Sequence, residues 1–266
     1  LFKKIKRNCY FFLRKIMLFV PNLIYSNKKH KYVFILSPPF SGSTLLNQIL
    51  SSSKNVSCNN NIGTREGQTL PGVKEIIFDS NRWDKNKKLP WQRIKKIWRS
   101  HWYLKKPILL DKSTTNIMRI NDLIKTFRTT YFICLIRNPY AICEGIMRRS
   151  GKSAEDAAKF TVDCLNYQMQ NIQNNENILF FSYEDLCDST DNIINKIKNY
   201  LKELNDIDAN QKFKAHNYKT KKSMYITNLN DEKIKKIQQK DLLTINNHFR
   251  DNKDLLDFFN YKLISY

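Results

Sequence analysis

The sequence has few of the features that define metal-bound and disulfide-linked proteins. Its six cysteines are far apart, with no CxxC pair, and its four histidines are equally scattered, with no HExxH motif. These spacings argue against the common zinc patterns and against a disulfide framework. We therefore expect free thiols and no metal ion.

Long apolar runs are also missing. The most apolar stretch of the first 25 residues is interrupted by Arg14 and Lys15, whereas a membrane-spanning helix needs ~20 mostly apolar residues. We interpret residues 1–30 as a basic amphipathic segment and slightly favour a helix packed on the domain over an interfacial helix, so membrane association by this segment stays open. No small-residue cleavage site follows the apolar stretch. The expected location is cytoplasmic, or membrane-associated or Golgi if an anchor precedes Leu1.

Acidic residues are scarce relative to basic ones. The chain has 46 Lys and Arg against 24 Asp and Glu, a formal net charge of +22. Such a balance favours anionic partners, namely nucleic acid, anionic lipid, or ligands carrying phosphate or sulfate, although solvated helix faces account for it equally well. Because no motif interleaves basic and aromatic residues in the manner of RNA-binding modules, we expect no specific nucleic-acid partner.

Short apolar runs bounded by polar segments predict buried strands, and stretches with helical spacing alternate with them. The expected strands cover residues 32–36, 108–110, 131–136 and 178–181, and the expected helices follow at 45–50, 116–127, 139–149, 153–174, 189–204 and 231–249. This alternation is typical of an α/β fold, a three-layer sandwich around a central parallel sheet of the P-loop NTPase-like kind, over residues 31–266. Residues 57–106 do not fit the alternation and are expected to form a loop and irregular helices that cover the carboxyl ends of the strands.

The first strand is followed directly by a turn rich in small hydroxyl residues and then by a helix. In this turn Gly42 allows a close backbone approach, while Ser41, Ser43 and Thr44 add hydroxyl donors. Backbone amides at the positive end of a helix form an anion-binding cradle. A plain helix N-cap explains the same residues. No GxxxxGK sequence is present, which disfavours a nucleotide kinase or NTPase.

Three blocks resemble those of the PAPS-dependent sulfotransferases, where PAPS is 3'-phosphoadenosine-5'-phosphosulfate. The blocks are Ser37–Leu46, Leu135–Pro139 and Phe181–Leu186. The resemblance is closer to the tyrosylprotein and carbohydrate type than to the cytosolic type. It implies that the 5'-phosphosulfate loop includes Ser41, Gly42, Ser43, Thr44 and Leu45, that Arg137 pairs with the 3'-phosphate, and that Tyr183 lies near the adenine.

The resemblance also implies which residues carry the chemistry. Lys112, directly after an expected strand, is the candidate for stabilising charge on the transferring group, and Glu66, in a loop between glycines, is the candidate general base. Two positions depart from the family pattern. Phe40 stands where a basic residue precedes the loop, and Gly145 stands where a serine follows eight residues after the arginine. Arg65, Arg148, Arg149 or the run 219–222 could supply the missing donors.

The function expected from the sequence is transfer of a sulfuryl group from PAPS to a hydroxyl of a carbohydrate, a tyrosine or a small metabolite, with PAP as the product nucleotide. Two alternatives stay open. One is a non-catalytic member that binds PAP or a polyanion, and the other is a P-loop nucleotide kinase. The sequence identifies neither the acceptor nor the oligomeric state.

Overall fold

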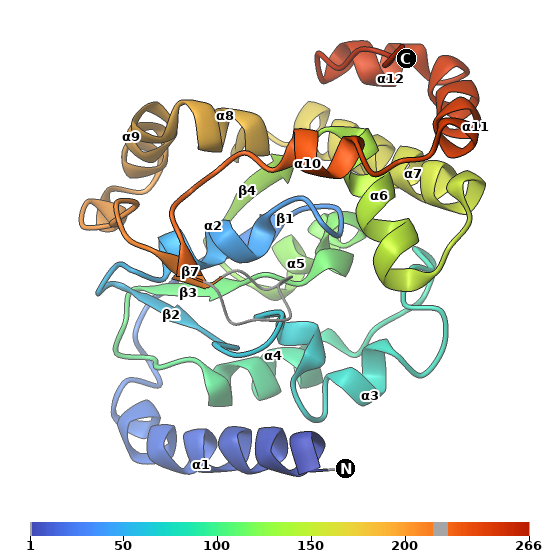
Figure 1. The fold of residues 1–266 in the computed structure, drawn as a ribbon. Helices are drawn as coiled ribbons and strands as arrows, with labels where there is room; N and C mark the ends of the chain where they lie inside the picture. Colours follow the sequence, from blue (N-terminus) through green and yellow to red (C-terminus); the bar gives the residue numbers. More distant parts are fainter. Residues whose placement is uncertain (1, 215–222, 266) are drawn as a thin grey trace.

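The computed structural model describes residues 2–214 and 223–265, with side chains from residue 5 onward. At its centre is a parallel sheet with strand order β2-β3-β1-β4-β5 (Figure 1). The strands are β1 (Lys31–Leu36), β2 (Val56–Cys58), β3 (Ile108–Asp111), β4 (Thr130–Ile136) and β5 (Ile178–Ser182). A separate antiparallel pair joins β6 (Phe213–Lys214) to β7 (Ser223–Met224).

Helices cover both faces of the sheet. The α-helices are α1 (Phe2–Ile24), α2 (Ser43–Leu50), α3 (Lys74–Ile77), α4 (Trp91–His101), α5 (Ile120–Thr126), α6 (Pro139–Ser150), α7 (Ala154–Gln173), α8 (Tyr183–Asp188), α9 (Thr190–Tyr200), α10 (Asn230–Ile234), α11 (Gln239–Arg250) and α12 (Lys253–Phe258). Short 3-10 helices occur at η1 (Gly67–Thr69), η2 (Thr114–Met118) and η3 (Lys202–Leu204).

The strands are buried because side chains on both of their faces meet a helix layer. In β1, Val33 and Ile35 pack with α2 and α9 in one core cluster, whereas Tyr32 and Phe34 pack with α4, α5 and α7 in another. Successive strand residues point to opposite faces, so a strand covered on both sides is apolar throughout. The predicted three-layer α/β sandwich is confirmed.

The four predicted strands are present, but the helix predicted at 116–127 is divided into η2 and α5, and two further parts of the prediction were wrong. Residues 56–58 form a fifth strand, β2, at the edge of the sheet beside β3, where only irregular structure was expected. In addition, the helix predicted at 231–249 is interrupted between α10 and α11. Between residues 57 and 106, the segment that includes Thr64, Glu66 and Trp83 lies at the carboxyl ends of the strands, as predicted, but α4 does not. Its Ile94 and Trp98 are instead buried in the core on one sheet face.

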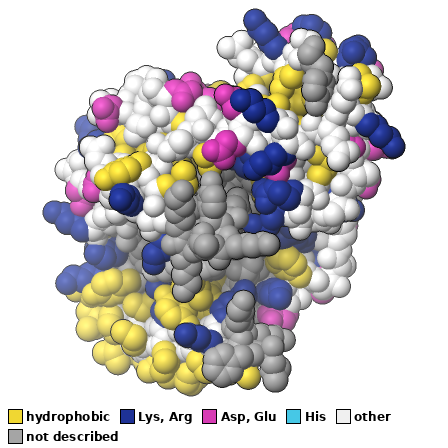
Figure 2. Space-filling view, in the orientation of Figure 1, with side chains coloured by type: hydrophobic (Ala, Val, Ile, Leu, Met, Phe, Trp, Pro, Cys, Tyr) yellow, Lys and Arg dark blue, Asp and Glu magenta, His cyan; other side chains and the backbone are white. Residues whose placement is uncertain are grey.

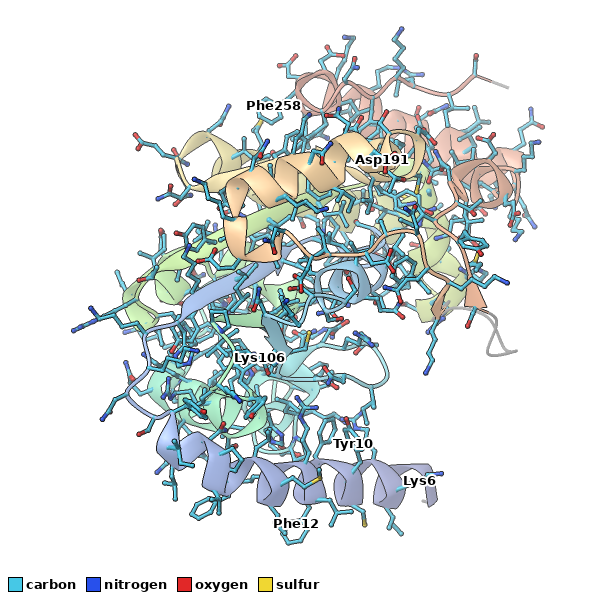
Figure 3. All side chains as sticks on the ribbon, turned by 90° about the vertical axis from the view of Figure 1, so that its left-hand side faces the viewer. Lys6, Tyr10, Phe12, Lys106, Asp191 and Phe258 are labelled. Atoms are coloured by element: carbon cyan, nitrogen blue, oxygen red, sulfur yellow. The ribbon has the colours of Figure 1, made fainter. Side chains whose placement is uncertain are left out.

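Helix α1 lies along the outside of the molecule, far from α12 (Figure 1). It packs against α4, with Phe11 buried in the same cluster as Trp98. Figure 3 shows Tyr10 on the side of α1 that faces the domain and Phe12 pointing away from it. Among the described residues, no helix is long and apolar enough to cross a bilayer.

Candidate active site

The carboxyl ends of β1, β3, β4 and β5 open into one cleft of about 1310 Å³. Each strand end continues into a segment that carries residues predicted from the sequence, because parallel strands end at the same edge of a sheet. The residues that line the cleft include Gly42, Ser43, Thr44, Leu45, Glu66, Lys112, Arg137 and Tyr183. Ser41 is the exception among the predicted residues. It is fully buried and its hydroxyl has no partner among the described groups.

The turn between β1 and α2 holds its amides in a form suited to an anion. Gly42 caps α2 with φ +87°, and Phe40 also has a positive φ, +66°. The first amides that bond back to the turn are those of Leu45 and Leu46, which both donate to the Gly42 carbonyl. The backbone amides of residues 40–44 have no hydrogen-bond acceptor within the described part of the chain. The N-terminal end of α2 is therefore open toward the cleft, as an oxyanion requires.

Lys112 and Glu66 meet beside this turn. The Lys112 ammonium lies 3.2 Å from Glu66 Oε1 and donates to Thr44 Oγ1 at 3.2 Å and to the carbonyl of Thr64 at 2.8 Å. Both side chains are buried, with the residues 2% and 8% exposed. The second carboxylate oxygen of Glu66 accepts a hydrogen bond from Gln68. The structure thus joins the two predicted catalytic residues to the loop hydroxyl in one network.

A buried carboxylate fixes the position of Glu66. Asp111, at the end of β3, accepts hydrogen bonds from Asn59 at 2.8 Å, from the Gly67 amide at 3.0 Å and from Asn116 at 2.8 Å. A Cβ at Gly67 would lie only 2.1 Å from Asp111 Oδ1, so no larger residue fits there. Burial raises the pKa of Asp111, although these hydrogen bonds oppose the shift. Asp111 thus connects the loop that carries Glu66 to the end of β3.

Arg137 leaves β4 and is almost completely buried, with 4% exposed. Its Nε donates to Asn230 Oδ1 at 2.7 Å and its Nη1 donates to the Phe40 carbonyl at 3.2 Å. The guanidinium lies over the Tyr183 ring, 4.0 Å from the ring centroid. Its Nη2 has no partner among the described residues. Burial lowers the pKa of Arg137, and an anion facing Nη2 would offset that desolvation.

Lys233, on α10, also lines the cleft and was not found from the sequence. Its ammonium is buried and has no hydrogen-bond partner in the described part of the chain. Burial, followed by the positive charge of Arg137, lowers the pKa of Lys233 to about 7. In the sequence this residue is one lysine among many, and only the folded position of α10 beside Arg137 distinguishes it. Lys233 and Arg137 together offer two buried cationic donors to one ligand.

The two departures from the family pattern are in contact. A Cβ built on Gly145 would lie 2.7 Å from Cγ of the Phe40 ring. The ring packs against α6 with the core cluster of α6, α7 and α11. A serine at position 145 would collide with this ring, so the aromatic residue before the loop and the glycine on α6 form one packing arrangement.

The remaining predicted donors are placed as follows. Arg65 binds Asn47 on α2 and Ser51 just after it, at 3.1 and 3.0 Å, and is not among the residues that line the cleft. Arg148 and Arg149 line the cleft, and Arg148 pairs with Glu144. The run 219–222 lies outside the described residues.

Tyr183 is 3% exposed, and its hydroxyl donates to the carbonyl of Thr227 at 2.8 Å. A Cβ on Gly42 would lie 2.5 Å from its ring, so the tyrosine packs directly on the loop. The next residue, Glu184, accepts hydrogen bonds from the Asn138 amide and from the Tyr261 hydroxyl, at 2.8 and 3.0 Å. Tyr183 therefore supports the loop and Arg137, and its contact with adenine stays a prediction.

Basic side chains outnumber acidic ones around the cleft. The lining residues include twelve Lys and Arg against five Asp and Glu. A cleft of this kind raises the local concentration of anionic ligands. An open parallel α/β sheet with an anion-binding turn and a basic cleft at its carboxyl edge defines a protein of the P-loop-like nucleotide-binding class.

Comparison with known proteins gives the family. A model described as the sulfotransferase family matches residues 33–206, more than half of the chain. The chain therefore belongs to the sulfotransferase family. No curated protein sequence matches the chain.

Solved structures show the same fold. The sulfotransferase domain of the olefin synthase of Synechococcus PCC 7002 is similar with a TM-score of 0.58 and 20% identity, covering 90% of this chain and 98% of that one. The sulfotransferase domain of the curacin biosynthetic pathway is similar with a TM-score of 0.53 and 18% identity. The match covers 88% of this chain and 99% of that one. Sulfotransferase STF9 of Mycobacterium avium is similar with a TM-score of 0.54 and 10% identity. The match covers 92% of this chain and 81% of that one. At these identities the similarity establishes the sulfotransferase fold.

Proposed function

We propose that this sulfotransferase uses PAPS as its donor and transfers the sulfuryl group to a hydroxyl of a carbohydrate, a tyrosine or a small metabolite. One observation carries the proposal. The cleft combines open loop amides with two buried cationic nitrogens, on Arg137 and Lys233, that have no partner among the described residues. PAPS has two separate anionic groups, a 5'-phosphosulfate and a 3'-phosphate, and so requires two anion-binding positions in one cleft.

The loop amides and the Thr44 hydroxyl would bind the 5'-phosphosulfate, and Arg137 with Lys233 would bind the 3'-phosphate. Charge-assisted hydrogen bonds of this kind are about twice as strong as neutral ones. The pairing of a guanidinium with the 3'-phosphate is what would distinguish PAPS from donors that lack this group.

In the reaction, Glu66 would accept the proton of the acceptor hydroxyl while the oxygen of that hydroxyl forms a bond to sulfur. The bond between sulfur and the 5'-phosphate oxygen breaks, and PAP leaves with the electron pair. Lys112 would move from Glu66 toward this oxygen and stabilise its growing charge. The 3.2 Å ion pair between Lys112 and Glu66 supports this assignment, because one small displacement of the ammonium would release the base and supply the cation.

A non-catalytic PAP-binding member is the second candidate. Phe40 favours it, because this residue replaces the basic side chain that the family pattern has before the loop. Formation of PAP from PAPS with a panel of hydroxyl acceptors, measured beside direct PAP binding, separates the two. Binding without any transfer would support the non-catalytic reading.

The donor assignment is tested by comparing PAP with AMP, which lacks the 3'-phosphate. Arg137→Ala should weaken PAP binding by about 1.5 to 3 kcal/mol, as expected for a lost hydrogen bond to a charged group, and should change AMP binding much less. Calorimetric titration gives both affinities, and a thermal melt of the variant shows that it is folded. Equal losses for both nucleotides, or no loss for PAP, would remove Arg137 from a 3'-phosphate site.

A further inference from the structure

Helix α1 exposes more large apolar side chains than it buries. Its side toward the domain is held by polar contacts, in which Arg14 donates to the His101 carbonyl at 3.0 Å and Asn22 donates to the Trp102 carbonyl at 2.8 Å. Arg7 on the same side donates to a backbone carbonyl at 2.6 Å. Among the described side chains of α1, Phe11 is the apolar one that is fully buried, with 2% exposed, and Tyr10 packs against the same core cluster. A surface helix of a soluble domain normally turns its apolar stripe to the core and its polar side to water.

The outward side of α1 is apolar along its length. Eight large apolar side chains of the helix are between 56% and 75% exposed, namely Phe12, Leu13, Ile16, Met17, Phe19, Val20, Leu23 and Ile24. Figure 2 shows hydrophobic side chains gathered over the region where Figure 1 places α1. Contiguous exposed apolar surface of this kind marks an interaction site rather than a free surface.

The charges around this face indicate the chemistry of the partner. Residues 1–30 contain eight Lys and Arg and no Asp or Glu. Lys6 and Lys15 are exposed on α1, and Lys28 and Lys29 are exposed just after it. An apolar face bordered by positive charge complements an anionic lipid surface. A second copy of the chain complements it poorly, since it would bring the same uncompensated cations together.

A hollow beside α1 extends the apolar surface. It has a volume of about 550 Å³ and is lined in part by Leu13, Met17, Val56 and Tyr103, with Lys106. A recess with apolar walls and a lysine can take an apolar chain and the negative charge next to it. A lipid, with an acyl chain beside an anionic headgroup, fits this recess.

We propose that α1 docks the enzyme on an anionic membrane surface, with Phe12, Ile16 and Val20 in the boundary between headgroups and acyl chains and the lysines against the headgroups. The helix would lie in the plane of the membrane, held to the domain by Arg14 and Asn22. Since Arg7 on the same helix also lines the active-site cleft, docking would keep one side of that cleft close to the bilayer. The proposal is independent of the donor and acceptor of the reaction.

The test is sedimentation of the full chain with vesicles at physiological ionic strength. Wild type should bind vesicles of phosphatidylcholine with phosphatidylserine and should bind pure phosphatidylcholine vesicles at least about tenfold more weakly. The double variant Ile16→Glu with Val20→Glu should lose at least about tenfold in affinity for the anionic vesicles. Both side chains are exposed, 56% and 62%, so the exchange does not disturb the fold. Leu243→Glu, at a residue 59% exposed on α11, is the matched control and should bind like wild type.

Three results would overturn the proposal. The first is absence of binding to the anionic vesicles, and the second is binding that the double variant retains. The third is a wild-type dimer in analytical ultracentrifugation that the double variant converts to a monomer, which would assign this face to a second copy of the chain.

Discussion

Glu66 has the environment of a carboxylate held in one orientation. Gln68 and Lys112 contact its two oxygens, and Gly67 beside it is fixed by Asp111. In the proposed mechanism, displacement of the Lys112 ammonium from its 3.2 Å contact would leave this carboxylate free to accept the proton of the acceptor hydroxyl. Donor binding would then be a condition for activating the acceptor.

The first prediction concerns Glu66→Gln. The amide has the same shape but cannot accept the acceptor proton, so transfer should fall by at least about 100-fold. The affinity for PAP, measured by calorimetry, should stay within about twofold of wild type because the proposed nucleotide contacts involve other residues. Glu75→Gln, on α3 and outside the cleft lining, is the control and should transfer normally. An active Glu66→Gln enzyme would require another base.

The second prediction concerns the pH dependence of PAP binding. In the free protein the pKa of Lys233 is lowered to about 7 by burial and by Arg137, and a bound phosphate would raise it. Below this pKa the lysine is already protonated, whereas above it binding must take up a proton. PAP affinity should therefore fall as pH rises above about 7, by up to about tenfold per pH unit. The phosphate, with a second pKa of about 6, is a dianion in this range and adds little to the slope.

Titrations in buffers of different ionisation enthalpy measure that proton uptake directly. Lys233→Met is the matched variant, since it keeps the length and apolar contacts of the side chain. It should bind PAP more weakly and with a flatter pH profile. If its slope equals that of wild type, Lys233 does not contact the nucleotide.

At the scale of elements, the turn between β1 and α2 packs against α6 through one close contact. The family pattern has a basic residue before the loop and a serine on the helix, and this chain has Phe40 and Gly145 in contact at these two positions. An aromatic ring there gives packing against α6 in place of two polar donors. In the sequence the two departures are 105 residues apart, and only the folded structure brings them into contact.

The third prediction is a double-mutant cycle on this contact. Gly145→Ser should destabilise the protein by about 1 to 3 kcal/mol, because its Cβ would overlap the Phe40 ring. In a Phe40→Ala background the same serine should cost much less, since the ring is gone. Free energies of unfolding from chemical denaturation give the coupling energy. Gly145→Ala separates the effect of the Cβ from that of the hydroxyl. Strict additivity of the two changes would show that the contact has no energetic weight.

The sequence predicted the elements whose signals are local. Strand β1 and helix α2 were found because an apolar run and helical spacing stand on either side of the Ser41–Thr44 turn. Strand β2 was missed, since three residues give no pattern and Val56–Cys58 is a strand only through its pairing with β3. The gap between α10 and α11 was also missed.

The candidate site was predictable where residues directly follow a strand. Lys112, Arg137 and Tyr183 each do so, and all three line the cleft. Lys233 comes from a short helix whose position depends on tertiary contacts, among them the bond from Arg137 to Asn230 in α10. A lysine of this kind is identified by burial and missing partners, and neither is visible in a chain with so many lysines.

For the whole molecule, the dominant electrostatic feature is the net charge of +22. Lysines and arginines are spread over the surface in Figure 2, and basic residues also predominate around the cleft. Excess charge of one sign destabilises the compact state by self-repulsion, while it attracts anionic ligands. The same charge therefore has opposite effects on folding and on donor binding.

The fourth prediction concerns the effect of salt on stability and on PAP binding, which should change in opposite directions. Raising sodium chloride from about 0.01 to 0.1 M shortens the screening length from about 30 to about 10 Å. The melting temperature of the free protein should rise by several degrees as self-repulsion is screened. Each kcal/mol gained in the free energy of unfolding corresponds to about 2 to 4 °C. The affinity for PAP should fall over the same range. Thermal melts with and without PAP measure both effects, and chloride is preferred because sulfate stabilises by exclusion from the surface. A melting temperature that falls with salt in the absence of PAP would mean that attractive ion pairs, rather than the excess of positive charge, dominate the folded state.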